Sequence, residues 1–419
     1  MGFNSIDEAI KDIKNGKMVI VIDDEGRENE GDLVMTASKV TPQHINFMAK
    51  YGRGLICIPI VGKRLDELKI EPMVENGKEL KEAIRHLNNQ NIKGLIFDLR
   101  FNGGGLLNEG VETSNQFLDQ GKLIVYTQGK KEEDLIKYFA REEPLYPDKP
   151  LVVLVDPQTA SASEILAGAI QDWDRGVIIG DTTYGKGLVQ TVLKMPDEVF
   201  LKLTIARYYI PSGRCIQKPE KSKRNLALLS EEAESDTSEN EIFYTNGGRV
   251  VYGGGGIVPD IVVQEERLKP IEINLERKQL FFDFAVRYIS QHEDLSKDFE
   301  VDDQIISEFK DFLEEKNFSY LTPVELSLQE LEKNIGSQKD KEIFDQILSE
   351  LKKVVQKSKE NDFQNSLDYI KKAIKRDILY GLHGEKAYYE EVLLKTDPVV
   401  KKAVEVLSDK AEYRKMLKG

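Results

Sequence analysis

The chain has 419 residues, of which 40% are hydrophobic and 32% are charged, and its formal net charge is −14 at pH 7. A chain of this length and composition can bury a large core and is expected to divide into two or three domains. Its acidic charge, without a dense basic stripe, argues against nucleic-acid binding and against attachment to an anionic membrane surface, and its two cysteines argue against a disulfide framework or a zinc site.

The first segment, residues 1–75, places short predicted elements around an acidic turn at 23–32. No stretch of the chain approaches the roughly 20 apolar residues that span a bilayer, and the N-terminus has no apolar run of signal-peptide length. We therefore expect a cytoplasmic location for the sequence as written. The predicted elements are a helix at 6–13, a strand at 18–22, a helix at 44–50 and a strand at 55–60.

From residue 79 the pattern changes to helices that alternate with short, wholly apolar runs. Such runs, separated by helices, are typical of a largely parallel sheet that is covered on both faces. We therefore expect an α/β core over 76–264. The predicted strands are 94–99, 123–126, 151–155 and 176–180, and the predicted helices are 79–91, 109–118 and 161–172.

The rest of the chain is polar or helical. Residues 218–240 are basic and then acidic, which is typical of a mobile surface loop. Residues 265–419 form a predicted helical region. Its apolar stripes indicate helix packing, and a partner-binding face is the less frequent alternative. The two clearest stripes are Ile343, Ile347 and Leu351, and Ile370, Ile374 and Ile378.

Two polar motifs carry candidate chemistry. Ser161 lies between alanines at the start of a predicted helix, and Lys186 lies between glycines further along the chain. A lysine can act as the base for a serine nucleophile if the fold desolvates its amine and holds it close to the hydroxyl. Each residue also has an ordinary interpretation: Ser161 with Glu164 fits a helix capping box, and Lys186 fits a flexible loop.

A third motif favours the catalytic interpretation. Residues 98–107 read Asp-Leu-Arg-Phe-Asn-Gly-Gly-Gly-Leu-Leu and follow a predicted apolar strand. Three glycines leave backbone amides uncovered, as an oxyanion hole requires. The alternative is a tight turn that needs positive φ. Together the three motifs point to nucleophilic hydrolysis of an acyl bond.

Residues 79–264 resemble the C-terminal processing (tail-specific) peptidases, serine endopeptidases with a Ser-Lys pair on a ClpP/crotonase-like core. The resemblance rests on four blocks in the same order and at similar spacing. They are Thr-Ala-Ser-Ala-Ser-Glu-Ile-Leu-Ala-Gly-Ala at 159–169, Thr-Tyr-Gly-Lys-Gly-Leu-Val-Gln at 183–190, Tyr-Tyr-Ile-Pro-Ser-Gly-Arg at 208–214 and Gly-Gly-Gly-Gly-Ile-Val-Pro-Asp at 253–260.

The resemblance implies a role for each matching residue. Ser161 would be the nucleophile, Lys186 the general base and Gln190 the side chain that orients the lysine, while the amides of Gly104 and Ala162 would form the oxyanion hole. Such a peptidase cleaves polypeptides and needs no cofactor. One departure is a glycine at 103, where the family often has proline. The four histidines lie outside all the blocks, which argues against a Ser-His-Asp triad.

Residues 3–75 resemble the start of an unrelated family, the 3,4-dihydroxy-2-butanone 4-phosphate synthases of riboflavin biosynthesis. The similar blocks are 19–33 and 52–57. In that family Glu28 would be a Mg²⁺ ligand, with Arg27 and Asp32 near the sugar-phosphate substrate. The later blocks of that family, including a metal-binding histidine, have no counterpart, so we expect little or no synthase activity.

The two resemblances meet at residues 75–78, so the sequence reads as a fusion. The helical segment, PDZ domain and first core strand that precede the peptidase core in that family are not found. A PDZ domain captures substrate C-termini by strand addition, so its lack leaves substrate capture open. The alternatives to an active peptidase are the synthase and a fusion without catalytic activity. Family members usually act outside the cytoplasm, in contrast with the location expected here.

Overall fold

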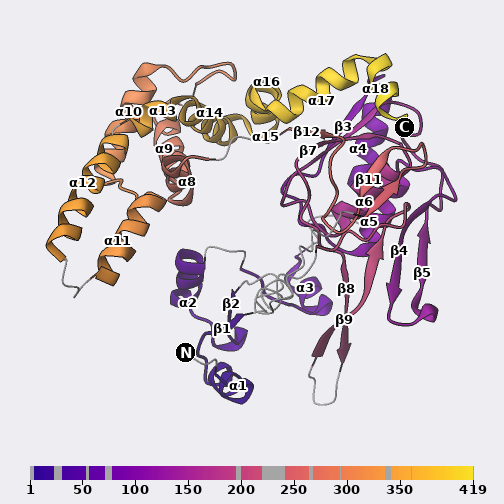
Figure 1. Ribbon diagram of the computed structural model, residues 1–419, viewed down its shortest axis with the longest axis horizontal. Coiled ribbons are helices and arrows are strands. Elements are labelled where there is room, and N and C mark those ends of the chain that lie inside the picture. Colours follow the sequence, from indigo (N-terminus) through magenta and orange to yellow (C-terminus); the bar gives the residue numbers. More distant parts are fainter. Residues whose placement is uncertain are drawn as a thin grey trace. The chain divides into compact units, whose positions relative to one another are not determined.

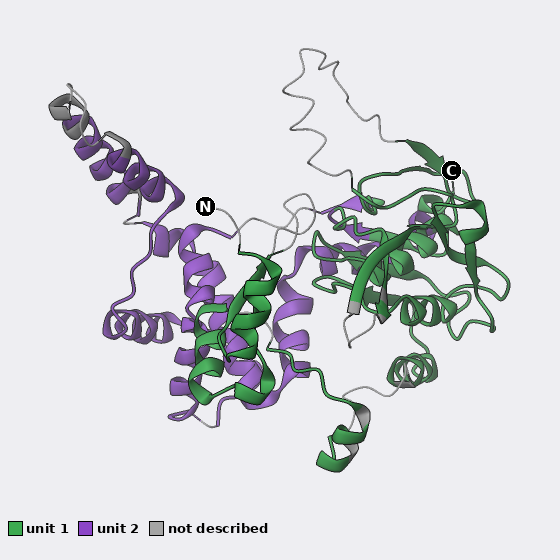
Figure 2. Ribbon diagram, turned by 90° about the horizontal axis from the view of Figure 1, so that it is seen from below, with its two compact units in different colours: residues 1–178, 182–260, 414–419 green, residues 179–181, 261–413 purple. Residues whose placement is uncertain are grey.

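The structure is a computed structural model that describes residues 4–22, 31–52, 56–70, 78–194, 200–218, 241–263, 268–292, 294–335, 341–359 and 361–418 (Figure 1). It divides into two compact units, coloured separately in Figure 2. Unit 1 comprises residues 1–178, 182–260 and 414–419, and unit 2 comprises 179–181 and 261–413. Each unit is described by itself.

The N-terminal segment forms the predicted helix and the first predicted strand. Ser5 and Glu8 cap the helix reciprocally, because each backbone N–H donates to the other's side chain. The two strands form an antiparallel hairpin. Over residues 56–60 the predicted strand is wrong, since no described strand lies beside them to complete a ladder. The elements are α1 (Ile6–Lys14), β1 (Val19–Ile22), β2 (Gly31–Val34), α2 (Pro42–Phe47) and α3 (Gly62–Leu68), with short helical turns at Ala37–Lys39 and Met48–Gly52.

None of the residues whose burial is described between 4 and 70 is buried. Large apolar side chains of this segment are therefore exposed to solvent. Among them are Ile6, Ile20 and Val61, which are 79%, 65% and 74% exposed. Hydrophobic burial is the dominant stabilising term in folding, and the described residues of this segment form no buried core among themselves.

A parallel sheet forms the centre of the α/β core. Its order is β12-β7-β6-β3, and β3 pairs with β6 from Leu95 opposite Leu151 onward. Every residue of β6 is buried, as the wholly apolar run predicts. The strands are β3 (Leu95–Asp98), β6 (Leu151–Val155), β7 (Val177–Gly180) and β12 (Ile261–Val262), and the helices between them are α4 (Lys78–Asn89), α5 (Leu107–Asn115) and α6 (Ala162–Asp172).

A second sheet is antiparallel and shows that one predicted strand was assigned to the wrong sheet. The apolar run at 123–126, expected in the parallel sheet, belongs to the sheet β5-β4-β9-β8. Only a short turn at Glu132–Asp134 separates β4 from β5, which is too short for the crossover that parallel strands need. The strands are β4 (Leu123–Gly129), β5 (Ile136–Phe139), β8 (Leu188–Lys194) and β9 (Phe200–Tyr209); a separate hairpin pairs β10 (Ile242–Tyr244) with β11 (Val250–Tyr252).

Helix α6 lies in the core, and all eleven of its residues are buried. Gly168 allows this close approach, because a Cβ there would lie 2.6 Å from Ile210 Cδ1. The helix therefore has a fixed position, and so does the turn that precedes it. The core around it includes Phe117, Leu118, Ile124, Leu151, Val153, Ile165, Ile170, Ile178, Ile210 and Ile257, each fully buried.

Unit 2 is helical beyond residue 268, as predicted. Ile370, Ile374 and Ile378 are fully buried, so their stripe packs a core. The other stripe differs, since Ile347 and Leu351 are 50% and 43% exposed. Their helix contributes Leu348 to a small cluster with Leu328 instead. The main helices are α8 (Pro270–Arg277), α9 (Leu280–Ile289), α10 (Asp303–Glu315), α11 (Pro323–Ile335), α12 (Lys341–Lys359), α13 (Asp362–Asn365), α14 (Leu367–His383), α15 (Glu385–Tyr388), α16 (Leu394–Thr396), α17 (Pro398–Ser408) and α18 (Lys410–Met416), with a helical turn at Tyr389–Leu393.

Within the described residues, no helix has both the length and the apolar character needed to cross a bilayer. The predicted surface loop at 218–240 lies outside the described residues except for Lys218 and so stays a prediction.

Candidate active site

Ser161 lies in the turn between β6 and α6 with a backbone conformation that is rare for its residue type. Its φ is 55° and its ψ is −117°. A non-glycine residue in such a region is strained, and strain of this kind gathers at functional sites. The side chain is half-buried. The outlier therefore marks this turn as a candidate active site.

The capping interpretation of Ser161 is correct only in part. Its backbone N–H donates to Glu164 Oε2 at 2.9 Å, but its hydroxyl makes no capping hydrogen bond. The Glu164 N–H donates to the Ser161 carbonyl oxygen instead, at 3.0 Å. The carboxylate therefore caps the helix while the serine hydroxyl is left for another role.

The glycine turn after β3 lies against the serine turn, because β3 and β6 are parallel neighbours and their carboxyl ends share one edge of the sheet. The Ala160 N–H donates to the Asn102 carbonyl oxygen at 3.0 Å. The Thr159 hydroxyl donates to the Leu99 carbonyl oxygen at 2.9 Å. These bonds fix the two turns relative to each other.

Gly104 makes the closest approach between these turns. Its φ is +87°, and a Cβ there would lie 2.5 Å from Ala160 O, 2.7 Å from Ala162 N and 2.9 Å from Ser161 Cβ. Ala162 is the first residue of α6, so its N–H has no acceptor within the helix. The Gly104 N–H donates to Asn102 Oδ1 at 2.9 Å. The structure thus brings together the two residues predicted for the oxyanion hole.

Lys186 lies in the turn between β7 and β8, and this turn is bonded to the serine turn. The Tyr184 N–H donates to the Thr159 carbonyl oxygen at 3.0 Å. The block at 253–260 also bonds to this turn. The Ile257 N–H donates to Thr183 Oγ1 at 2.7 Å, and the Thr183 N–H donates to Ile257 O at 3.1 Å. The block at 253–260, which has no evident chemistry of its own, therefore helps to position the turn that carries the lysine.

Tyr208 is a neighbour that Ser161 and Lys186 share. It lies in β9, is 7% exposed, and its N–H donates to the Gly187 carbonyl oxygen at 2.8 Å. Burial raises the pKa of the Tyr208 hydroxyl, whereas a hydrogen bond with the Ser161 side chain and the charge of Lys186 lower it. Sequence reasoning missed this residue, whose sole signal is its place in the block at 208–214.

Gln190 lies in β8, four residues after the lysine, beside a bulge between Val189 and Gln190. Bulges often re-aim side chains next to active sites. The Gln190 Nε2 group donates to Thr204 Oγ1 at 3.4 Å. The role of Gln190 in orienting Lys186 stays a prediction.

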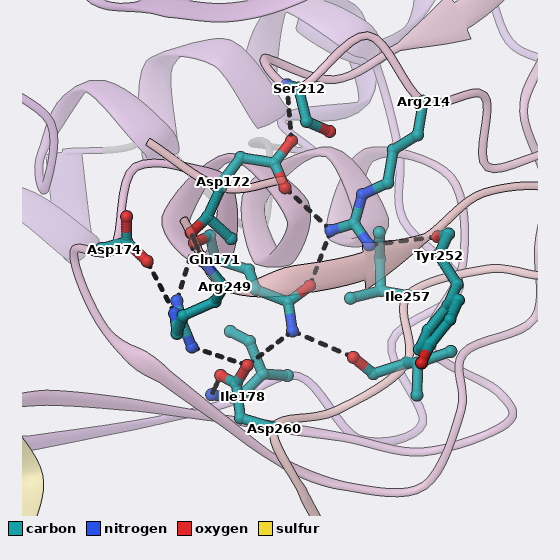
Figure 3. Close-up of polar contacts among 12 residues, drawn as sticks. Gln171, Asp172, Asp174, Ile178, Ser212, Arg214, Arg249, Tyr252, Ile257 and Asp260 are labelled. Atoms are coloured by element: carbon teal, nitrogen blue, oxygen red, sulfur yellow. Dashed lines mark hydrogen bonds and ion pairs between the residues drawn. The ribbon is translucent and has the colours of Figure 1, made fainter. Parts of the chain in front are cut away.

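A buried ion network supports the far end of α6 (Figure 3). Arg214, fully buried, donates to Gln171 Oε1 at 2.6 Å and to Asp172 Oδ1 at 2.9 Å. Arg249 pairs with Asp174 and Asp260 at 2.6 and 2.7 Å. The arginine of the block at 208–214 and the aspartate of the block at 253–260 are therefore structural.

Of the three synthase-like residues the structure describes only Asp32, so the predicted metal role of Glu28 stays a prediction. Asp32 lies exposed in β2, and Arg27 and Glu28 lie outside the described residues. Where the structure describes the chain, no three His, Cys, Asp or Glu side chains gather as metal ligands. The described residues thus do not supply the oxygen cage that Mg²⁺ needs.

Known families match three parts of the chain. Residues 64–222 match peptidase family S41, residues 7–92 match 3,4-dihydroxy-2-butanone 4-phosphate synthase, and residues 271–407 match the C-terminal helical domain of a probable PDZ-protease. The chain therefore carries an S41 C-terminal processing peptidase domain with a synthase segment before it and a helical domain after it. The first two matches overlap, so a junction at 75–78 stays a prediction, and residues 75–77 lie outside the described residues.

Individual relatives agree with these matches. The chain is 34% identical over 209 residues to the carboxy-terminal-processing protease of Bartonella bacilliformis, covering 48% of this chain and 40% of that protein. It is 65% identical over 71 residues to riboflavin biosynthesis protein RibBA of Aquifex aeolicus, covering 17% and 18%. A solved photosystem II D1 C-terminal processing protease is 32% identical, with a TM-score of 0.34 and coverage of 45% and 39%. The chain spans less than half the length of each.

Proposed function

We propose that the chain is a serine endopeptidase that hydrolyses peptide bonds in polypeptides with Ser161 as nucleophile and Lys186 as general base. The observation that carries the proposal is the contact of Gly104 with the Ser161 turn. It places two backbone amides, those of Gly104 and Ala162, beside a strained serine at a helix N-terminus. This is the arrangement that acyl transfer needs, a nucleophile next to donors for a developing oxyanion.

The proposed reaction has two steps. Neutral Lys186 takes the proton of the Ser161 hydroxyl while the oxygen attacks the substrate carbonyl carbon, and the amides of Gly104 and Ala162 stabilise the oxyanion. The C–N bond breaks as the lysine passes its proton to the leaving amine. Water then attacks the acyl-enzyme, with Lys186 again as base, and releases the acid. No cofactor takes part.

The test combines cleavage with covalent labelling. The purified full chain should cleave an unfolded model protein with an apolar tail, and a fluorophosphonate should abolish cleavage by bonding phosphorus to Ser161 Oγ with loss of fluoride. Peptide mapping locates the label, and a Ser161→Ala variant should take up none. Cleavage that survives full labelling, or that stops when EDTA is added, would contradict the proposal.

Replacing Gly104 by alanine is expected to lower kcat by about 10²–10³, because the new Cβ would clash with the serine turn and displace an oxyanion donor. Gly103→Ala and Gly105→Ala are matched controls. A Cβ at either position meets nothing within 4 Å, so their kcat should be nearly unchanged. Equal kcat values for the three variants would count against the oxyanion role of Gly104.

The synthase is the second candidate, favoured by the 65% identity of residues at the start of the chain to RibBA. That alignment covers only 18% of the relative, and Glu28 is the single metal ligand the resemblance supplies. We therefore expect no formate release from ribulose 5-phosphate in the presence of Mg²⁺. Release that disappears in a Glu28→Gln variant would establish this second activity.

A further inference from the structure

We propose that Glu164 is a positioning residue whose single carboxylate holds the Ser161 turn and the Lys186 turn in the register that proton transfer requires. The inference rests on the proposed function, and it gives a role to a buried acid that the reaction itself does not use. Glu164 lies in the first turn of α6 and is 0% exposed.

The carboxylate bonds to both turns at once. Its Oε2 atom accepts the Ser161 N–H at 2.9 Å and the Lys186 N–H at 2.8 Å. Its Oε1 atom accepts the Gly185 N–H at 2.7 Å and the Thr183 hydroxyl at 2.5 Å. One oxygen atom therefore connects the backbones of the two residues proposed to exchange a proton.

Three partners of Glu164 are backbone N–H groups, which can only donate, and the Thr183 hydroxyl also donates to it while accepting the Ile257 N–H. An ionised carboxylate suits this set of donors, because it is an acceptor at both oxygens. Burial raises the pKa of the Glu164 carboxyl above its usual value, and the four hydrogen bonds offset only part of this rise. Hydrogen bonds to a charged acceptor are short and strong, which suits a rigid link.

An amide in place of this carboxylate would break the link. Glutamine has nearly the same shape but offers one accepting oxygen and one NH₂ group, which would face the donors of one turn. At least one backbone N–H would be left buried without an acceptor, and one turn would shift. A displacement of about 1 Å in reacting groups can lower a rate by about 100-fold.

Glu272 is a matched control for a purely local capping role. It occupies the same position in the first turn of α8, is 4% exposed, and accepts the Lys269 N–H at 2.8 Å. Among the described residues, its hydrogen bond and its ion pair are both with Lys269, so it caps a helix without linking two turns. Glu272→Gln thus changes a buried capping carboxylate without touching the proposed register.

The kinetic experiment compares Glu164→Gln, Glu164→Asp and Glu272→Gln with the wild type. We expect Glu164→Gln to lower kcat by about 100-fold with KM changed less than about threefold, because the turns align the reacting groups rather than bind substrate. Glu272→Gln should retain wild-type kcat. Glu164→Asp keeps the charge but has a shorter side chain, so its kcat should lie between those of Glu164→Gln and the wild type. Wild-type kcat in both Glu164 variants, or a rise in KM alone, would overturn the inference.

A second measurement does not depend on activity. Hydrogen exchange of the amides at 161, 185 and 186 should be at least about tenfold faster in Glu164→Gln than in the wild type, and unchanged in Glu272→Gln. If Glu164→Gln does not fold, the Glu164→Asp variant carries the same test. A wild type that neither cleaves nor reacts with the fluorophosphonate would contradict the proposed function. Unchanged hydrogen exchange at these amides would contradict the inference about Glu164.

Discussion

Replacing Ser161 by alanine is expected to lower kcat/KM for peptide-bond cleavage by at least about 1,000-fold. In the proposed reaction the nucleophile and its base act as one unit, so removing either should lower kcat/KM nearly as much as removing both. Lys186→Ala should therefore give a similar loss, and the double variant should add little. The measurement is the initial rate on an unfolded, apolar-tailed protein, followed by mass spectrometry of the products.

Ser161→Ala should lower the free energy of unfolding by only about 1 kcal/mol, because the serine hydroxyl makes no capping bond and contributes one hydrogen bond with Tyr208, while the strained backbone is the same with alanine. Lys137→Ala, which removes an exposed lysine of β5, is the control and should cleave at the wild-type rate. A Ser161→Ala protein that folds normally and still cleaves would rule out Ser161 as the nucleophile.

Replacing Arg214 by alanine is expected to destabilise the peptidase domain by about 3–5 kcal/mol, since it leaves the Asp172 carboxylate buried without its cation. The two side chains are 0% and 1% exposed, and their bond is 2.9 Å. Burial raises the pKa of the Asp172 carboxyl, and the charge of Arg214 opposes it. Urea unfolding, followed by fluorescence of Trp173, the one tryptophan of the chain, measures the change.

Two further variants separate burial from charge. Arg287→Ala removes an ion pair with Glu315 whose side chains are 49% and 59% exposed, and it should leave the unfolding midpoint unchanged. Arg214→Met combined with Asp172→Leu should recover part of the stability lost in Arg214→Ala, because no unpaired charge is left buried. Equal destabilisation by Arg214→Ala and Arg287→Ala would contradict the role assigned to the network.

The sequence predicted strands β6 and β7 of the parallel sheet well, because both are wholly buried and their apolar runs are unbroken. Strand β6 spans the predicted residues 151–155 and helix α6 begins one residue after its predicted start. The family assignment followed from short blocks whose order and spacing are specific, and the comparisons confirm it. Ser161, Gly104 and Ala162 lie together as expected, since each follows a strand of one parallel pair.

What the sequence did not reveal depends on contacts between distant segments. Strand β9 mixes apolar and polar residues, and Tyr208 lies opposite Thr127 of β4, more than 70 residues earlier. The position of Tyr208 beside Ser161 therefore depends on pairing between distant strands. Glu164 was identified as a helix cap from its local spacing, but its bonds to Gly185 and Lys186 come from a turn about 20 residues later, which no local pattern encodes.

The bond from the Gly104 N–H to Asn102 Oδ1 has a consequence for selectivity between ground state and transition state. The amide oxygen of Asn102 is chemically the same kind of acceptor as a peptide carbonyl. A neutral substrate carbonyl therefore gains little by taking its place, whereas an oxyanion, as a charged acceptor, forms a much stronger bond. In the proposed reaction Asn102 would hold the Gly104 N–H until the oxyanion forms, so this amide would stabilise the tetrahedral intermediate more than the bound substrate.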